Sequence, residues 1–83
     1  MKFLAEINVM PRKEILDPQG KAVTGSMKNL GLDGIGNVRI GKHITLEIEA
    51  ENETIANEKV TTACEKLLAN LIMEYYDFEL TAI

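Results

Sequence analysis

The sequence predicts an α+β sandwich, in which two helices cover one face of a four-stranded antiparallel sheet in the order β-α-β-β-α-β. Apolar and polar residues alternate with period two near both ends of the chain and in its middle, as expected for half-buried strands. Two segments between them carry apolar residues at helical spacing. With 83 residues, 46% hydrophobic and 27% charged, the chain is expected to form one domain over residues 1–83.

The first strand and first helix are predicted from alternation and from capping. Residues 2–10 place every second apolar side chain on one face, which predicts a strand. Asp17 can accept hydrogen bonds from the first turn of a helix, and Pro18 loses none at the first helical position. Gly31 can adopt the left-handed conformation that ends a helix, which predicts helix over 18–30.

The middle of the chain predicts a hairpin. After turn residues 33–37, a short strand at about 37–41 is expected at a sheet edge, followed by a strand over 44–50. A loop over 41–43 pairs Ile40 with Ile44 and keeps the apolar residues of both strands on one face.

A second helix and a last strand complete the pattern. The helix is expected to begin at 51–54, and Asn70 is expected to stop it in a left-handed conformation. The last strand is predicted at about 75–82. The expected core stripe of the helix consists of Ala56, Val60, Ala63, Cys64 and Leu67.

The element order is that of a ferredoxin-like sandwich, with both helices on one face. The open face is then polar and is expected to meet solvent or a partner. A hard-cation site among its five carboxylates is the alternative, although no loop is available to wrap an ion. The face is expected to present Lys2, Leu4, Glu6, Asn8, Arg39, Thr45, Glu47, Glu49, Tyr75, Asp77 and Glu79.

Charge and hydropathy exclude several classes of function. A net charge of -4 and a pI near 4.9 disfavour nucleic-acid binding, which needs clustered Lys and Arg. No apolar run exceeds three residues, so neither a membrane span nor a signal peptide is expected. The single cysteine and the missing signal indicate a cytoplasmic protein.

The residues offer no catalytic constellation for the isolated domain. Cys64 lies on the core stripe, where a buried, inert thiol is expected, and His43 is expected on a solvated loop. One histidine and one cysteine cannot complete a zinc site. Arg12 and Lys13 precede a helix N-terminus, but Asp17 occupies that end and no glycine-rich phosphate loop follows. The chain is therefore not expected to be an enzyme on its own.

Three segments together resemble one family. They are Ile15-Leu16-Asp17-Pro18-Gln19-Gly20-Lys21-Ala22-Val23, Val38-Arg39-Ile40-Gly41-Lys42 and Cys64-Glu65-Lys66-Leu67-Leu68-Ala69-Asn70. With this length and element order, the chain resembles the PurS family, the small subunits of phosphoribosylformylglycinamidine (FGAM) synthase. The chain departs from the family after Asn70, where Leu71 replaces the usual proline.

The resemblance implies a non-catalytic subunit in de novo purine biosynthesis. A glutaminase subunit releases ammonia, and a large subunit that binds ATP and magnesium activates formylglycinamide ribotide by phosphorylation. The small subunit bridges the two and supports ammonia transfer, holding no cofactor itself. The family motifs match Asp17, Pro18, Gln19 and Gly20 in the first segment, and Arg39, Gly41 and Lys42 in the second.

These seven residues are the candidate partner interface. Asp17 through Gly20 can also be explained by helix capping, whereas Arg39 and Lys42 have no evident local role and are the stronger candidates. An edge strand at 37–41 also predicts a homodimer, or a tetramer formed as a dimer of dimers. The alternative function is a ferredoxin-like domain that senses a small molecule, which leaves the Leu-Asp-Pro-Gln-Gly segment without a reason.

Overall fold

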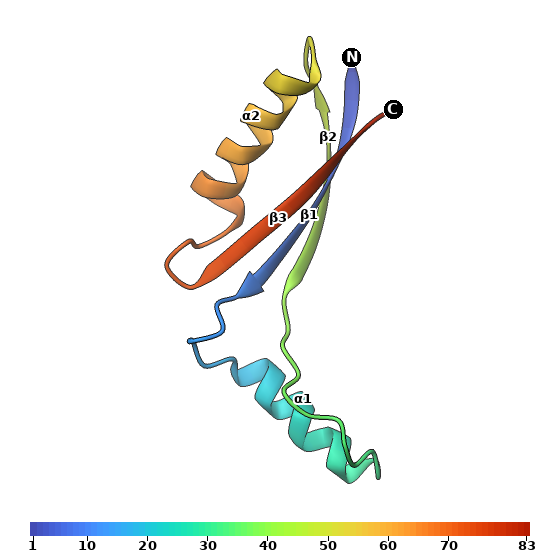
Figure 1. Cartoon of the computed structure of the whole chain (residues 1–83), viewed down its shortest axis with the longest axis vertical. Coiled ribbons are helices and arrows are strands. Elements are labelled where there is room, and N and C mark those ends of the chain that lie inside the picture. The colour runs from blue at the N-terminus through green and yellow to red at the C-terminus, as the bar shows by residue number, and fades with distance from the viewer.

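The computed structural model describes residues 1–83 as one elongated body of 52 × 27 × 14 Å (Figure 1). Three strands form an antiparallel sheet in the order β2-β1-β3, and two helices connect them. The element order is therefore βαβαβ. The elements are β1 (Lys2–Pro11), α1 (Pro18–Asn29), β2 (Lys42–Glu49), α2 (Glu53–Ala63), its π-helical continuation η1 (Cys64–Leu68) and β3 (Glu74–Ala82).

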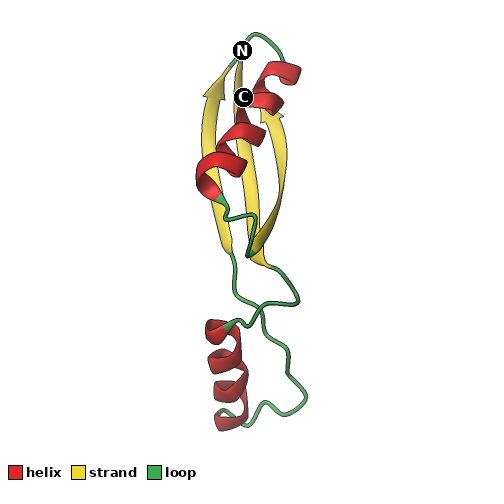
Figure 2. Cartoon of the chain, turned by 90° about the vertical axis from the view of Figure 1, so that its left-hand side faces the viewer, coloured by secondary structure: helices red, strands yellow, loops and turns green.

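The core lies between α2 and one face of the sheet (Figure 2). The alternation predicted for the first strand is confirmed, because every second side chain from Phe3 to Val9 is buried. Ala56, Val60 and Cys64 are fully buried against this row. One helix does not cover three strands, and the inward side chains of β2 remain half-buried: Ile44, Leu46 and Ile48.

The opposite face of the sheet is polar, as expected. Asn8 donates a hydrogen bond to Asp77 on β3 (3.0 Å) and its side-chain oxygen lies 2.7 Å from Nδ1 of His43 on β2. Glu6 stands directly opposite Glu79 in the β1–β3 register. Like charges in directly opposite positions of a sheet are destabilising, so this face keeps an unfavourable contact that no nearby cation relieves.

The prediction of a fourth strand is wrong. Residues 37–41 lie outside the sheet and carry no regular secondary structure, and the chain continues from them directly into β2 without a hairpin. Two side chains take the place of a partner strand. Thr24 accepts a hydrogen bond from the backbone N–H of Val38 (3.1 Å), and Asp17 accepts one from the backbone N–H of Ile40 (2.8 Å), so these groups need no hairpin. The sheet is three-stranded, and the ferredoxin-like order does not form within one chain.

The expectation that both helices cover one sheet face is also wrong. Only α2 lies on the sheet, whereas α1 stands beyond its end, beside the connection that leads to β2 (Figures 1 and 2).

The predicted limits of α1 are confirmed. The helix ends in a Schellman motif, in which Gly31 has φ +75°. The N–H of Gly31 donates to the carbonyl of Lys28 (3.0 Å), and the N–H of Leu32 donates to the carbonyl of Met27 (2.9 Å). Residues 12–41 thus form an arm that contains a single buried residue, Gly20.

The end of the second helix differs from the prediction. The N–H of Ala69 bonds to the carbonyl of Cys64 (2.9 Å), so a π-helical turn adds one residue to the last turn. Leu68 and Ala69 consequently face the core, and Leu67, predicted in the core stripe, is 81% exposed. Asn70 does not adopt a left-handed conformation; Asn37 is the only non-glycine residue with positive φ. No helix in the protein has the length and apolar character needed to cross a membrane.

Candidate partner-binding site

Asp17 links the two sequence motifs that carry the seven candidate residues. Its Oδ1 accepts from the N–H of Gly20 (3.0 Å) and caps α1, as predicted. Its Oδ2 accepts from the N–H of Ile40 (2.8 Å). The Ile40 hydrogen bond, followed by the Gly20 bond, holds the pKa of Asp17 below its ordinary value of 3.8. Capping therefore explains only half of what this carboxylate does.

Gly20 allows these motifs to approach closely. A Cβ at this position would collide with the carbonyl oxygen of Val38 and with the carboxylate of Asp17. Thr24, one turn further along α1, donates to the carbonyl of Gly20 (2.8 Å) and accepts from the N–H of Val38 (3.1 Å). Two hydrogen bonds, one to Asp17 and one to Thr24, thus join the start of α1 to the segment before β2.

Arg39 has a structural role that the sequence did not reveal. Its Nη2 donates to the carbonyl oxygen of Arg12 (2.7 Å) and lies within 3.3 Å of that of Ile15 and 3.4 Å of that of Pro11. The expectation that Arg39 lacks a local role is therefore wrong, because it ties the connection after β1 to the segment before β2. Its Nε and Nη1 donors have no partner in the chain and remain available.

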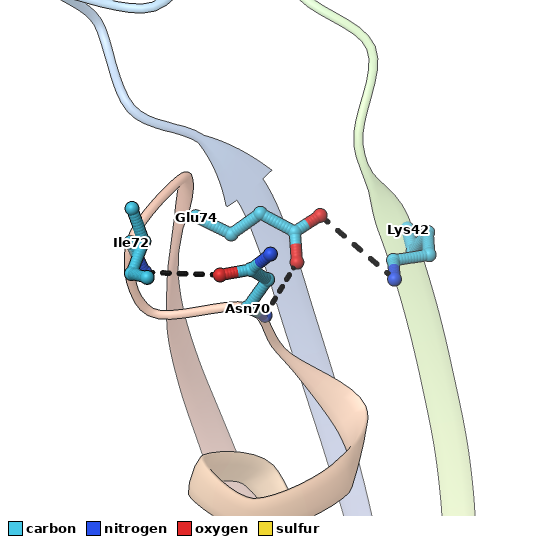
Figure 3. A network of polar contacts seen from close by, with 4 residues as sticks. All are labelled: Lys42, Asn70, Ile72 and Glu74. Atoms are coloured by element: carbon cyan, nitrogen blue, oxygen red, sulfur yellow. Dashed lines mark hydrogen bonds and ion pairs between the residues drawn. The ribbon is translucent and has the colours of Figure 1, made fainter.

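Gly41 and Lys42 also have local roles at the start of β2. A Cβ on Gly41 would collide with the carbonyl oxygen of Val9 and with Met10, so glycine lets the chain pass β1 closely. Lys42 forms an ion pair with Glu74 (3.8 Å) across the end of the sheet (Figure 3). The other oxygen of Glu74 accepts from the N–H of Asn70 (2.7 Å), so this pair also anchors the turn before β3.

A shallow cationic hollow lies where the two motifs meet. It has a volume of about 370 Å³, and Lys21 and Arg39 contribute positive charges to its wall. Lys13 lines a second hollow that shares Asn37 and Arg39 with the first. Pro18 and Gln19, by contrast, lie exposed at the start of α1 and outside this lining. The first hollow is lined by Leu16, Asp17, Lys21, Thr24, Asn37, Val38 and Arg39.

A group of exposed apolar side chains lies at the end of η1 and in the turn after it, and we call it the apolar turn. Leu67 and Ile72 are 81% and 84% exposed, and Leu71 and Met73 are also exposed. Arg12 holds the turn, since its Nε and Nη2 donate to the carbonyl of Leu71 (3.0 and 2.8 Å). Contiguous exposed apolar residues on an ordered turn are typical of protein interaction surfaces.

Comparison with known proteins identifies the family. The family model described as "PurS: Phosphoribosylformylglycinamidine (FGAM) synthase" matches residues 4–82. Among similar proteins, the PurS subunit of Synechocystis is 47% identical over 98% of this chain and 81% of its own, and that of Bacillus subtilis is 33% identical over 98% and 95%. The chain belongs to the PurS family.

Solved structures of PurS proteins have the same fold. The Thermotoga maritima PurLQS structure contains a chain with a TM-score of 0.89 and 34% identity, covering 98% of this chain and 99% of that one. Bacillus subtilis PurS has a TM-score of 0.85 and 34% identity, covering 95% and 98%. The resemblance that the motifs indicate is confirmed, and with it the function as a subunit of FGAM synthase in purine biosynthesis.

The residues with reactive side chains are scattered in this PurS family member. No three His, Cys, Asp or Glu side chains are grouped to hold a metal ion. Cys64 is fully buried, as expected, and burial, with a smaller contribution from Glu65, raises the pKa of its thiol. His43 lies exposed on β2 rather than on a loop, beside Asn8. Neither side chain has the neighbours that nucleophilic chemistry requires.

Several residues of the candidate surface were not predicted from the sequence. Lys13, Lys21 and Asn37 join Arg39 only because the segment 37–41 folds back beside α1, and no local pattern indicates that return. The apolar turn follows from the π-helical turn, which helical periodicity does not reveal. The one available signal was the run of three apolar residues after Asn70.

Proposed function

We propose that the chain is the bridging subunit of its FGAM synthase, which holds a glutaminase subunit and a large ATP-dependent subunit together and supports ammonia transfer between them. The observation that carries this proposal is the 34% identity and TM-score of 0.89 to a chain of the Thermotoga maritima PurLQS structure. The chain resembles that one over almost its whole length, so its surfaces are expected to serve the same assembly.

The cationic hollow is proposed as one contact with a partner. The free donors of Arg39 and the ammonium groups of Lys13 and Lys21 suit carboxylates on the opposing surface. Four candidate residues support this surface through contacts within the chain: Asp17, Gly20, Gly41 and Lys42. Pro18 and Gln19 are exposed, and we propose direct contact for them.

The apolar turn is proposed as a second contact. Met73 of this turn lines a hollow together with Leu16, which is exposed and adds further apolar surface. A surface with apolar and cationic parts suits a protein partner better than a small metabolite, because the hollows are shallow and open to solvent. We also propose that ATP and magnesium bind only the large subunit.

We further propose that the chain forms a homodimer, or a tetramer formed from two dimers. Both outer strands of the sheet, β2 and β3, have an unpaired edge, and exposed edges favour pairing with another chain. A sedimentation mass above the 9.2 kDa of one chain is expected at micromolar concentration. A mass of one chain would contradict this part of the proposal.

Reconstitution with the glutaminase and large subunits of the same organism tests the bridging role. Product formation is measured with glutamine and with ammonia as the nitrogen source, each with and without this chain. A bridging subunit is expected to raise the glutamine-driven rate and to leave the ammonia-driven rate much less affected. Equal rates with and without the chain from both nitrogen sources would overturn the proposal.

A further inference from the structure

The outer edge of β3, on the opposite side of the sheet from β2, is unpaired. The N–H of Ile83 donates to the carbonyl of Lys2 (2.8 Å), and the carbonyl of Met73 accepts from the N–H of Arg12 (2.8 Å), so odd-numbered residues bond to the β1 side. Because these groups alternate in direction along a strand, the even-numbered residues of β3 point away from β1. Their N–H and carbonyl groups form a row without partners in the chain: Tyr76, Phe78, Leu80 and Ala82.

β3 carries none of the features that usually protect an edge strand. Its nine residues include no Lys, Pro or Gly, and its pairing with β1 runs without a bulge from Glu74 to Ala82. Proteins that leave an edge unpaired commonly interrupt it with such residues or with a bulge. The inward side chains beside the edge are also left half-buried by α2: Tyr76, Phe78 and Leu80. The edge therefore combines unused hydrogen-bonding groups with uncovered apolar surface.

The outer face of the same edge is acidic. Asp77 and Glu79 are exposed, and neither forms an ion pair within the chain. Glu79 stands directly opposite Glu6, and the residue opposite Glu6 on the other side is the uncharged Thr45. The one direct neighbour position of Glu79 that remains free lies beyond β3, where a cation would relieve the like-charge contact.

We propose that the β3 edge receives an extended segment of a partner subunit, which adds a strand to the sheet and carries Lys or Arg at every second position. Its basic side chains lie beside Asp77 and Glu79 on the outer face, and its alternate, apolar side chains lie beside Tyr76 and Phe78 on the inner face. Tyr75, 41% exposed on the outer face, adds an aromatic surface for the same cations. The inference rests on the bridging role under Proposed function and deepens it by naming a contact surface and the chemistry that binds there.

The acidic residues also argue against a second copy as the occupant. When two β3 edges pair antiparallel about a two-fold axis at Phe78, Asp77 of each copy stands opposite Glu79 of the other. An axis at Asp77 sets the two Asp77 carboxylates against each other. Like charges in directly opposite positions destabilise a sheet, whereas a basic segment gains at both positions. The edge therefore suits a different chain with positive side chains.

Hydrogen exchange on the unmodified chain locates the contact. The N–H groups of Tyr76, Phe78 and Leu80 are expected to exchange fast in the isolated chain and at least about tenfold more slowly after reconstitution with the glutaminase and large subunits. The N–H groups of Asp77 and Glu79 are the internal control, because they point toward β1 and are already bonded in the isolated chain.

Glu79→Lys tests the charge complementarity. It is expected to weaken partner binding by about tenfold or more, because it sets a cation against the basic segment. It also removes the like-charge contact with Glu6, so the variant should unfold at a higher urea concentration than the unmodified chain, which separates weaker binding from a damaged fold. Glu58→Lys is the matched control, because Glu58 is exposed on α2 and the net charge changes equally. This control is expected to bind as the unmodified chain does.

Fast exchange of the three even-numbered groups in the assembled complex would overturn the β3 contact, as would equal affinities of Glu79→Lys and the unmodified chain. Slow exchange of these groups already in the isolated chain would assign the edge to a second copy and would also overturn it. In each case, a glutamine-driven rate that still depends on the chain leaves the bridging role standing. A reconstitution in which no rate depends on the chain overturns the bridging role, and the β3 contact with it.

Discussion

The carboxylate of Asp17 accepts a hydrogen bond from the backbone N–H of Ile40, 23 positions further along the chain, at 2.8 Å. This bond joins the N-terminus of α1 to the segment before β2, and Arg39 adds a second tie to the connection after β1. Together they hold an arm that buries almost nothing. Polar contacts of this kind, rather than apolar burial, fix the position of the arm.

Asp17 is expected to make stability depend on pH in a defined way. Its pKa is lowered in the folded protein, chiefly by the N–H of Ile40, so its stabilisation is complete above the ordinary value of 3.8 and is lost as the pH falls through the folded value. Asp17→Asn removes this titration. In urea unfolding, the stability difference between the two proteins should be constant near neutral pH and shrink below about pH 4.

A difference that stays constant down to pH 2 would mean that ionisation of this carboxyl group adds nothing to the stability of the fold. Asn52→Ala is the control, because Asn52 caps α2 through the N–H of Ile55 (2.9 Å) and does not titrate. Its loss should cost about 0.5–2 kcal/mol at every pH.

Two glycines of the same helix are expected to respond in opposite directions to alanine. Gly20→Ala brings a Cβ into the Val38 carbonyl and should lower the free energy of unfolding by about 1–3 kcal/mol. Gly25→Ala meets no atom within 4 Å and should raise it by about 0.5–1 kcal/mol through helix propensity. Chemical denaturation measures both, and a stabilising Gly20→Ala would show that the close approach to the segment before β2 is absent in solution.

Prediction from sequence succeeded where a structure depends on neighbours in the chain. The alternation in β1, the cap at Asp17 and the Schellman end at Gly31 are local, and all three were predicted. It failed at 37–41, because a short alternation of apolar and polar residues looks the same whether the segment pairs in a sheet or bonds to side chains at the start of α1. The competing acceptors, Asp17 and Thr24, lie 23 and 14 residues away.

The sequence motifs indicated some residues of the candidate site, but not its geometry. The motifs indicated Arg39 as an interface residue, yet its contacts with three carbonyls could not be inferred without the return of the segment beside α1. Likewise, a π-helical turn shifts the register by one residue, so Leu67 and Leu68 exchange the roles that a regular helix would give them.

Arg39→Glu is expected to destabilise the domain as well as to weaken assembly. Removing a charged donor from the Arg12 and Ile15 carbonyls should cost about 1–3 kcal/mol of stability. Lys21→Glu separates the effect on binding from the effect on stability, because Lys21 is exposed and forms no ion pair. Its fold should be unaffected, whereas its binding to the large subunit should weaken. Unchanged stability of Arg39→Glu in urea would contradict the structural role, and unchanged binding of Lys21→Glu would remove the hollow from the interface.

Neighbouring leucines at the end of α2 should separate folding from assembly. Leu67 is 81% exposed, so Leu67→Ser should change the free energy of unfolding by less than about 0.5 kcal/mol. Leu68 packs on the core, so Leu68→Ala should cost about 2 kcal/mol or more. Leu67→Ser and Ile72→Ser should nevertheless reduce the glutamine-driven rate of the reconstituted synthase at limiting subunit concentration, because the apolar turn loses its contact with a partner. If the variant that combines Leu67→Ser with Ile72→Ser assembles normally, as measured by co-sedimentation, then no partner covers this turn.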